Sequence, residues 1–174
     1  MTAVVGEVAK TDPRKAAEMI ARMDPEQRAD SYRSVAAQYG AMDFAEAQTW
    51  IRTLPADDQE GALASAIEGL SGKDPAAAAK QVSAMPDGEA KDRLVGDVVR
   101  DLARKDTQAA EDFLKEQTSE EAQRDVMRDL MPALNGRNPI AALAFVNSYQ
   151  PGPVRDSAAQ AYVTGELEVH DDLG

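Results

Sequence analysis

The sequence predicts an all-α fold, a right-handed-type α-solenoid of about five helical hairpins with a leading half-repeat. Three observations predict it. An Asp or Asn anchor returns every 31 or 32 residues, an alanine stands four residues after each anchor, and apolar residues follow the spacing of one helix face. Alanine is also the best helix former, and strand-forming residues are scarce. The anchors are Asp12, Asp43, Asp74, Asp106 and Asn138.

These anchors divide the chain into repeats with short turns between them. The predicted repeats are 12–42, 43–73, 74–105, 106–137 and 138–169, with a half-repeat at 1–11. The half-repeat has the pattern of the end of a second helix from a preceding unit. No linker or change of composition interrupts the pattern, so residues 1–174 are predicted to form a single domain.

The first helix of each repeat is predicted to begin at its anchor. An Asp or Asn at the N-cap accepts hydrogen bonds from free backbone N–H groups, and proline is tolerated directly after it. The alanine four residues on would mark a close approach of two helices, where a larger side chain would cost about 1–3 kcal/mol. Trp50 is predicted to lie in the core, since its position in the repeat matches those of Met19 and Phe113, and an exposed contact for a partner is the alternative. The anchored alanines are Ala16, Ala47, Ala78, Ala110 and Ala142.

The second helix of each repeat carries an apolar stripe of its own, beginning at residues such as Tyr32 and Leu94. Asp24, Asp57 and Thr118 are expected to be its N-caps, each with Glu or Gln three residues on. Its C-terminal ends are expected at left-handed glycines, namely Gly40, Gly72 and Gly136. Arginines early in this helix are expected to pair with acids or carbonyl groups at a turn between repeats, namely Arg28, Arg93, Arg124 and Arg155.

The pattern Asp43…Trp50…Leu54-Pro55 resembles bacterial repeats of the form Asp-Pro-x-Ala-Ala…Trp…Leu-Pro…Arg. More broadly, residues 3–168 resemble the tetratricopeptide-like and HEAT-like families of helical hairpins. The tetratricopeptide signature itself is absent, and HEAT units are longer. The resemblance implies a scaffold for protein interactions.

Composition excludes several kinds of chemistry. The chain has no cysteine and a single histidine, His170, so thiolate zinc sites, cysteine nucleophiles and paired-histidine zinc motifs are impossible. Adjacent carboxylates such as Glu120 and Glu121 point away from each other on a helix and do not form an acid–base pair. We therefore expect no enzyme activity, cofactor or metal.

A net charge of −12 argues against direct binding to nucleic acid or to an anionic membrane. The sequence has no signal-peptide pattern and no apolar run long enough to span a bilayer. A cytoplasmic location is the default expectation, and the compartment is otherwise open.

The function expected first is a protein- or peptide-binding scaffold that uses the outward face of the first helices. The alternative is an acidic decoy that mimics nucleic acid and inhibits a basic protein; it ranks second because the acidic residues are scattered. The apolar residues Val4, Val5 and Val8 also allow an end-to-end homodimer. The candidate partner-binding residues are Arg14, Lys15, Arg22, Arg52, Lys80, Lys115 and Asn147.

Overall fold

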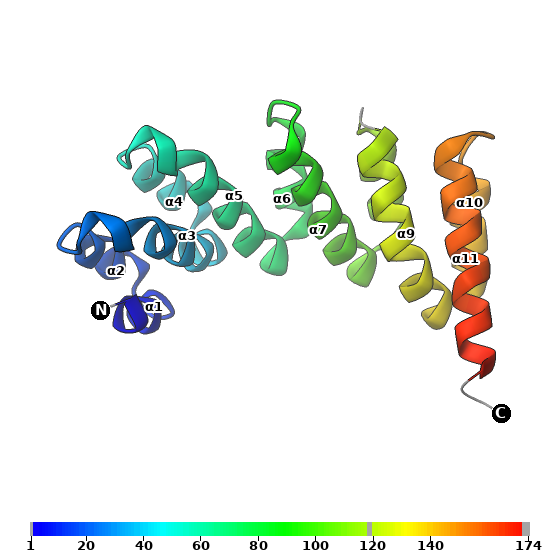
Figure 1. The fold of residues 1–174 in the computed structure, drawn as a ribbon, viewed down its shortest axis with the longest axis horizontal. Coiled ribbons are helices and arrows are strands. Elements are labelled where there is room, and N and C mark those ends of the chain that lie inside the picture. The colour runs from blue at the N-terminus through cyan, green and yellow to red at the C-terminus, as the bar shows by residue number, and fades with distance from the viewer. Residues whose placement is uncertain (1, 118–119, 172–174) are drawn as a thin grey trace. The chain divides into compact units, whose positions relative to one another are not determined.

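The computed structural model describes residues 2–117 and 120–171, and this part of the chain is all-helical with no strand (Figure 1). The all-α prediction is therefore confirmed. The helices are α1 Thr2–Ala9, α2 Pro13–Ile20, α3 Pro25–Met42, α4 Phe44–Ile51, α5 Ala56–Lys73, α6 Pro75–Ser83, α7 Glu89–Lys105, α8 Thr107–Lys115, α9 Glu120–Arg137, α10 Pro139–Asn147 and α11 Pro153–Asp171.

The chain divides into two compact units, Met1–Met85 and Pro86–Gly174. Unit 1 contains α1 to α6 and unit 2 contains α7 to α11. The boundary falls in the turn between α6 and α7, inside the predicted third repeat at 74–105. The single domain expected from the sequence stays a prediction, and each unit is described by itself.

The five anchors are N-caps of the short first helices, as predicted. Each anchor side chain accepts a hydrogen bond from a backbone N–H two or three residues on, for example from Lys15 to Asp12 at 2.9 Å and from Ala141 to Asn138 at 3.1 Å. The four anchors after Asp12 also directly follow the last residue of the preceding helix. The N–H of Asp43 donates to the carbonyl of Tyr39 at 2.7 Å, so one residue closes one helix and opens the next.

The glycine C-caps predicted for the second helices are wrong. Gly40, Gly72 and Gly136 lie inside α3, α5 and α9, which continue to the residue before the next anchor. None of these three glycines has a positive φ. The anchor's backbone N–H satisfies a carbonyl of the last turn, so these ends need no left-handed residue.

The N-terminal caps predicted for the second helices also need correction. α5 begins at Ala56 after an N-cap at Pro55, and Asp57 lies in the first turn. Asp24 is the N-cap of α3, but its side chain makes no capping hydrogen bond. Acidic residues within the first turn still favour a helix start through its dipole. Thr118 lies outside the described residues.

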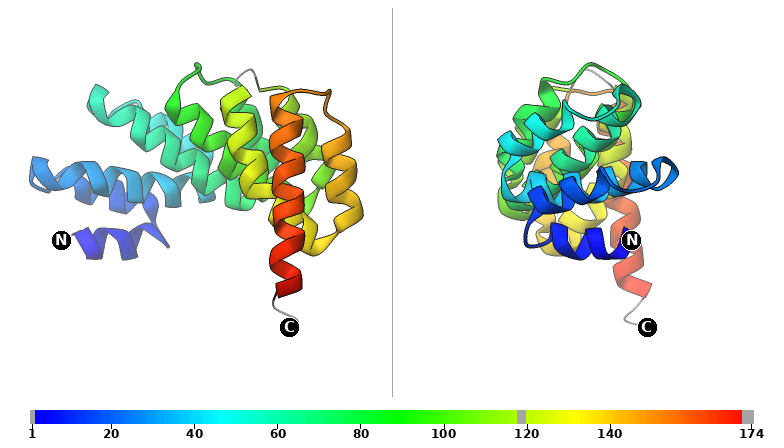
Figure 2. Two further views of the ribbon diagram at one scale, coloured as in Figure 1. Left: turned by 45° about the vertical axis from the view of Figure 1, so that its right-hand side comes forward. Right: turned by 90° about the vertical axis from the view of Figure 1, so that its left-hand side faces the viewer.

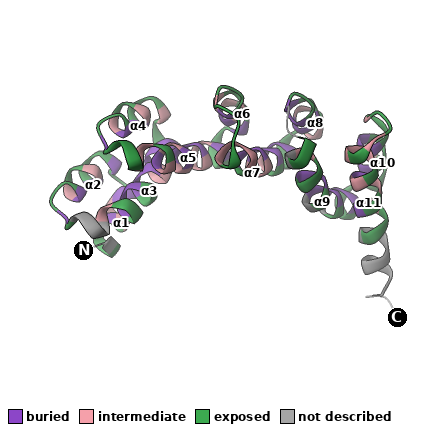
Figure 3. Cartoon of the chain, turned by 45° about the horizontal axis from the view of Figure 1, so that its top comes forward, coloured by how far each residue is buried: buried purple, intermediate pink, exposed green. Residues whose placement is uncertain are grey.

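Unit 1 has two layers, with α2 and α4 on one side of α1, α3 and α5 (Figure 3). The second helices α3 and α5 cross at very short range. A Cβ added to Gly40 would overlap the backbone of Ala66, and one added to Gly69 would overlap the carbonyl of Ala37. These glycines therefore serve the packing of α3 against α5.

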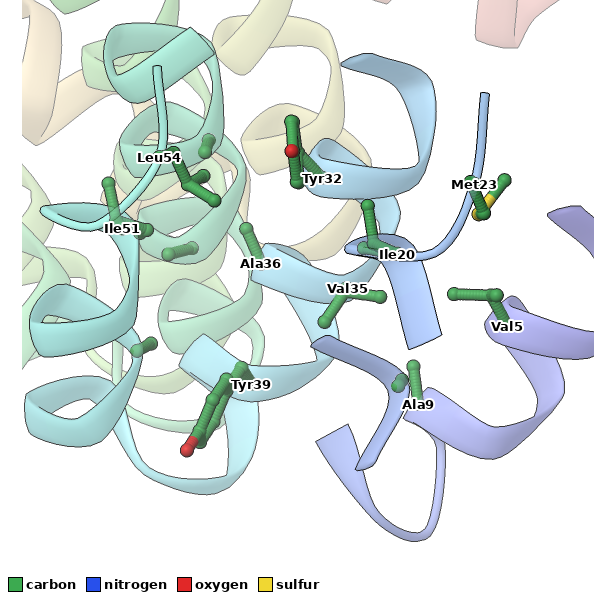
Figure 4. Close-up of a cluster of buried hydrophobic side chains, with 14 residues drawn as sticks. Val5, Ala9, Ile20, Met23, Tyr32, Val35, Ala36, Tyr39, Ile51 and Leu54 are labelled. Atoms are coloured by element: carbon green, nitrogen blue, oxygen red, sulfur yellow. The ribbon is translucent and has the colours of Figure 1, made fainter. Parts of the chain in front are cut away.

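The core of unit 1 lies between the two layers (Figure 4). Val5, Ile20 and Val35 from three successive helices are fully buried in it, as are the anchored alanines Ala16 and Ala47. Of the three valines expected at an exposed apolar end, Val5 is thus buried and Val8 packs on the core, while Val4 is 57% exposed.

In unit 2, as in unit 1, the short first helices pack on the longer second helices. α8 packs on α7, α10 packs on α9, and α11 lies beside α9 (Figure 2). Ala110 and Ala142 are fully buried, and Leu114, Met127 and Phe145 are among the largest fully buried side chains. The alanine positions predicted from the repeat are confirmed as core positions in both units.

Candidate functional site

A groove in unit 1 runs between α2 and α4, with α3 beneath it. Its volume is about 650 Å³ and it is open to solvent. Small side chains such as Ala17 and Ala21 leave the space, because a larger residue at either position would fill it. The lining residues are Arg14, Ala17, Glu18, Ala21, Tyr39, Glu46, Thr49, Trp50 and Thr53.

The aromatic part of this groove is Trp50, the only tryptophan of the chain. Its ring lies 6.1 Å, centroid to centroid, from the rings of both Tyr32 and Tyr39. These two tyrosines are seven residues apart on α3 and therefore share one helix face. Both are buried, whereas Trp50 is only partly buried. The prediction that Trp50 is a core residue is thus half right, because its ring also lines the groove.

A polar network joins α2, α3 and α4 at the edge of the groove. Arg14 Nη2 lies 2.5 Å from Glu46 Oε1, and the Tyr39 hydroxyl donates to Glu46 Oε2 at 3.0 Å. The hydrogen bonds from Arg14 and then Tyr39 lower the pKa of Glu46. Burial, more than any other cause, raises the pKa of Tyr39. Glu46 is therefore held ionised with both carboxylate oxygens engaged.

Glu18 is the second carboxylate of the groove. It is exposed on α2, and it has no ion pair or hydrogen bond within the described residues. The side-chain charges of the groove are one guanidinium and two carboxylates. Because Arg14 and Glu46 compensate each other, the negative charge that remains belongs to Glu18.

The corresponding space in unit 2, between α8 and α10, is arranged differently. Lys115 Nζ lies 2.5 Å from Glu111 Oε1 and 5.2 Å from the centre of the Tyr149 ring. The Tyr149 hydroxyl is buried without a hydrogen-bond partner among the described residues, and burial together with Glu111 raises its pKa. A lysine of the chain itself thus lies between a carboxylate and an aromatic ring.

A second cleft of unit 2, about 530 Å³, lies between α7 and α9. Five carboxylates and two arginines line it, and Asp97 pairs with Arg100. This cleft has no aromatic side chain. Its lining residues are Glu89, Asp92, Arg93, Gly96, Asp97, Arg100, Glu121, Asp125 and Val126.

The seven candidate residues from the sequence are all exposed. In unit 1 only Arg14 lines the groove, while Lys15, Arg22, Arg52 and Lys80 lie elsewhere on the first helices or directly after them. In unit 2, Lys115 contacts Glu111, and Asn147 accepts a hydrogen bond from Arg155 at 3.2 Å.

Sequence reasoning selected charged outward positions and therefore missed Tyr39 and Trp50. Trp50 was assigned to the core by its phase on the helix, and Tyr39 was not singled out. The signal that could have identified the groove is the pair of small residues Ala17 and Ala21, which face the aromatic ring of the next first helix.

Within the described residues, no group of three or more acidic or histidine side chains is placed to hold a metal ion, and the side chain of His170 lies outside them. The same part of the chain contains no helix with the length and apolar character of a membrane span. In comparisons with known proteins, no family model, no curated protein and no solved structure matches this chain.

Proposed function

We propose that this chain is a non-catalytic scaffold that binds a peptide segment of a partner protein in the groove between α2 and α4. The observation that carries the proposal is the partly exposed Trp50, supported from below by Tyr32 and Tyr39. Tryptophan is among the residues most enriched at the energetic centres of protein interfaces. A rigid aromatic side chain that is already held in place loses little conformational entropy on binding.

The shape of the groove favours a peptide over a small molecule. It is open to solvent between two helices, and Ala17, Ala21 and Trp50 give it an apolar part. Threonines and charged side chains also line it, and a protein interface likewise combines apolar and polar side chains. Enclosed cavities that surround most of a ligand are more typical of small-molecule sites.

The proposed scaffold is a right-handed-type α-solenoid of five hairpins with a leading half-repeat. The recurrent helix bounds, the shared cap at each anchor, and the order of first and second helices within each unit support it. Small-angle X-ray scattering tests it, because a compact chain of this length has a radius of gyration of about 16 Å. A solenoid gives a larger value, and a value near 16 Å would contradict it.

Peptide display tests the binding function. A random-peptide library is selected on the full chain, with a Trp50→Ala variant as the counter-selection target. We expect peptides that bind the natural chain and lose at least tenfold in affinity for Trp50→Ala, because truncating an interface centre costs about 2 kcal/mol or more. Arg52→Ala, at the residue directly after α4 and outside the groove, is the matched control and should retain binding.

The alternative, an acidic decoy for a basic nucleic-acid-binding protein, has one observation in its favour. The cleft between α7 and α9 carries five carboxylates without an aromatic centre. A decoy would bind basic proteins in competition with DNA, with strong salt dependence, and Trp50→Ala would not affect this binding. Selected peptides that bind the natural chain and Trp50→Ala equally well would count against the groove.

A further inference from the structure

The two units differ in the residue that stands nine positions after the anchor of a first helix. In unit 2, Lys115 stands nine residues after its anchor and places its ammonium group between Glu111 and Tyr149. In unit 1, the residue nine positions after the anchor is Ala21, which lines the groove. Unit 1 therefore lacks a cation at this position, whereas in unit 2 Lys115 itself lines a pocket of about 490 Å³ together with Tyr149.

The groove of unit 1 nevertheless retains the two kinds of group that hold such a cation. Trp50 offers an aromatic ring, and Glu18 offers a carboxylate without an ion pair in the described part of the chain. A cation over a tryptophan face is stabilised by the ring quadrupole, more strongly than over tyrosine or phenylalanine. The Arg14 side chain does not supply this cation, because it is bound to Glu46 on the neighbouring helix.

We infer that the groove binds a lysine or arginine side chain of the peptide, with its cation held by Glu18 and the ring of Trp50. The inference rests on the proposed peptide-binding function and names the chemistry of its ligand. An acidic peptide side chain would meet the uncompensated Glu18, while the one guanidinium of the groove is already paired. The net charge of −12 also favours the approach of a basic partner.

Trp50 makes the test specific, since the only tryptophan of the chain reports binding at the groove by its fluorescence. The probes are peptides from the display experiment, and each is also made with its Lys or Arg replaced by Gln or Glu. We expect every strong binder to carry a Lys or Arg whose change to Gln weakens binding by about tenfold, and whose change to Glu weakens it further.

Two variants of the full chain examine the groove itself. Glu18→Gln should weaken binding of the Lys peptide by about fivefold, whereas Glu60→Gln, an exposed carboxylate outside the groove on α5, should leave it within about twofold. Ala21→Lys introduces the internal cation that unit 2 has, and should abolish the fluorescence change. Ala21 is exposed, so this variant should keep the far-ultraviolet circular dichroism of the natural chain.

The outcomes separate the two proposals. Binders that change Trp50 fluorescence but lack a cation, or that tolerate Gln in its place, would overturn the inference and leave the peptide-binding function standing. Unchanged affinity in both Glu18→Gln and Ala21→Lys would overturn it as well. If no peptide is selected in a Trp50-dependent manner, the proposed function itself fails.

Discussion

Glu46 is the residue through which three helices of unit 1 meet. Its carboxylate accepts from Arg14 on α2 and from Tyr39 on α3, and it projects from the first turn of α4. Glu46 and Arg14 are both about half exposed or more, so water weakens the ion pair. We therefore regard its main effect as positional, because it fixes one edge of the groove beside Trp50.

The lowered pKa of Glu46 gives a prediction about pH. A carboxyl group whose pKa is lower in the folded state contributes stability above its unfolded pKa and loses it as pH falls through the folded value. Glu46→Gln should therefore be slightly less stable than the natural chain near pH 7, and the difference should vanish near pH 3. Urea denaturation at both pH values measures it. An equal loss of stability at pH 7 and pH 3 would show that the carboxylate charge is not the cause. Glu60→Gln, which removes a carboxylate elsewhere, is the control.

At the scale of one helix, the anchors close one element and open the next, as Asp43 does between α3 and α4. Asp43→Ala removes only the side-chain hydrogen bond to the Glu46 N–H, and should cost about 1 kcal/mol in the free energy of unfolding. Asp24→Ala is the matched change at an N-cap without a side-chain bond, and should cost less. Urea denaturation compares the two. Equal losses would mean that helix-dipole effects, and not the hydrogen bond, dominate at these positions.

Helix caps and buried helix positions, which depend on residues close together in the chain, could be predicted from the sequence. Caps and helix phase arise from a few neighbouring residues, so the anchors and the buried alanines such as Ala16 were found correctly. The role expected for Arg28 was partly right. It donates to the Met23 and Ala21 carbonyls, which belong to the turn inside its own repeat. Gln59 bonds the equivalent turn at Leu54, so any long side chain with a suitable donor can satisfy these carbonyl groups.

The roles of residues that depend on the distance between two helices could not be predicted from the periodicity of the sequence. Gly40 looked like a helix end, because glycine near the end of an apolar stripe is typical of a C-cap. Its role instead comes from Ala66 on another helix, about which the local sequence carries no information. Trp50 has a core phase, yet the alanines opposite it on α2 leave part of its ring beside an open groove.

The close contact between α3 and α5 leads to a prediction about the stability of a variant at Gly40. Gly40→Ala would force its Cβ into the backbone of Ala66, which cannot move aside as a flexible side chain can. We expect a loss of about 1–3 kcal/mol, in spite of the higher helix propensity of alanine. Gly61→Ala on α5 is the control, because its Cβ would lie 3.7 Å from the Arg33 side chain, and it should stabilise by up to about 1 kcal/mol. Chemical denaturation of both variants checks this, and a stabilised Gly40→Ala would contradict the close crossing.

For the whole molecule, the division into two compact units leads to a prediction about how the chain unfolds. Each unit has its own buried core, with Ile20 and Ile67 in unit 1 and Leu94 and Met131 in unit 2. In stacked repeats, stability is a sum of local terms and nearest-neighbour terms, so a local defect can unfold one part before the rest. Trp50 belongs to unit 1, whereas helical circular dichroism reports on both units.

The Gly40→Ala variant therefore distinguishes units that unfold independently from units that unfold together. If the units unfold independently, the thermal midpoint from Trp50 fluorescence falls, and the circular dichroism transition broadens or splits, because unit 2 keeps its own core. We expect this result, since the chain divides at Met85 and Pro86 into two compact parts. The natural chain, followed by both probes, is the reference. Fluorescence and circular dichroism midpoints that fall together in a single sharp transition would instead mean that the defect in unit 1 is transmitted to unit 2, as strong coupling between neighbouring repeats requires.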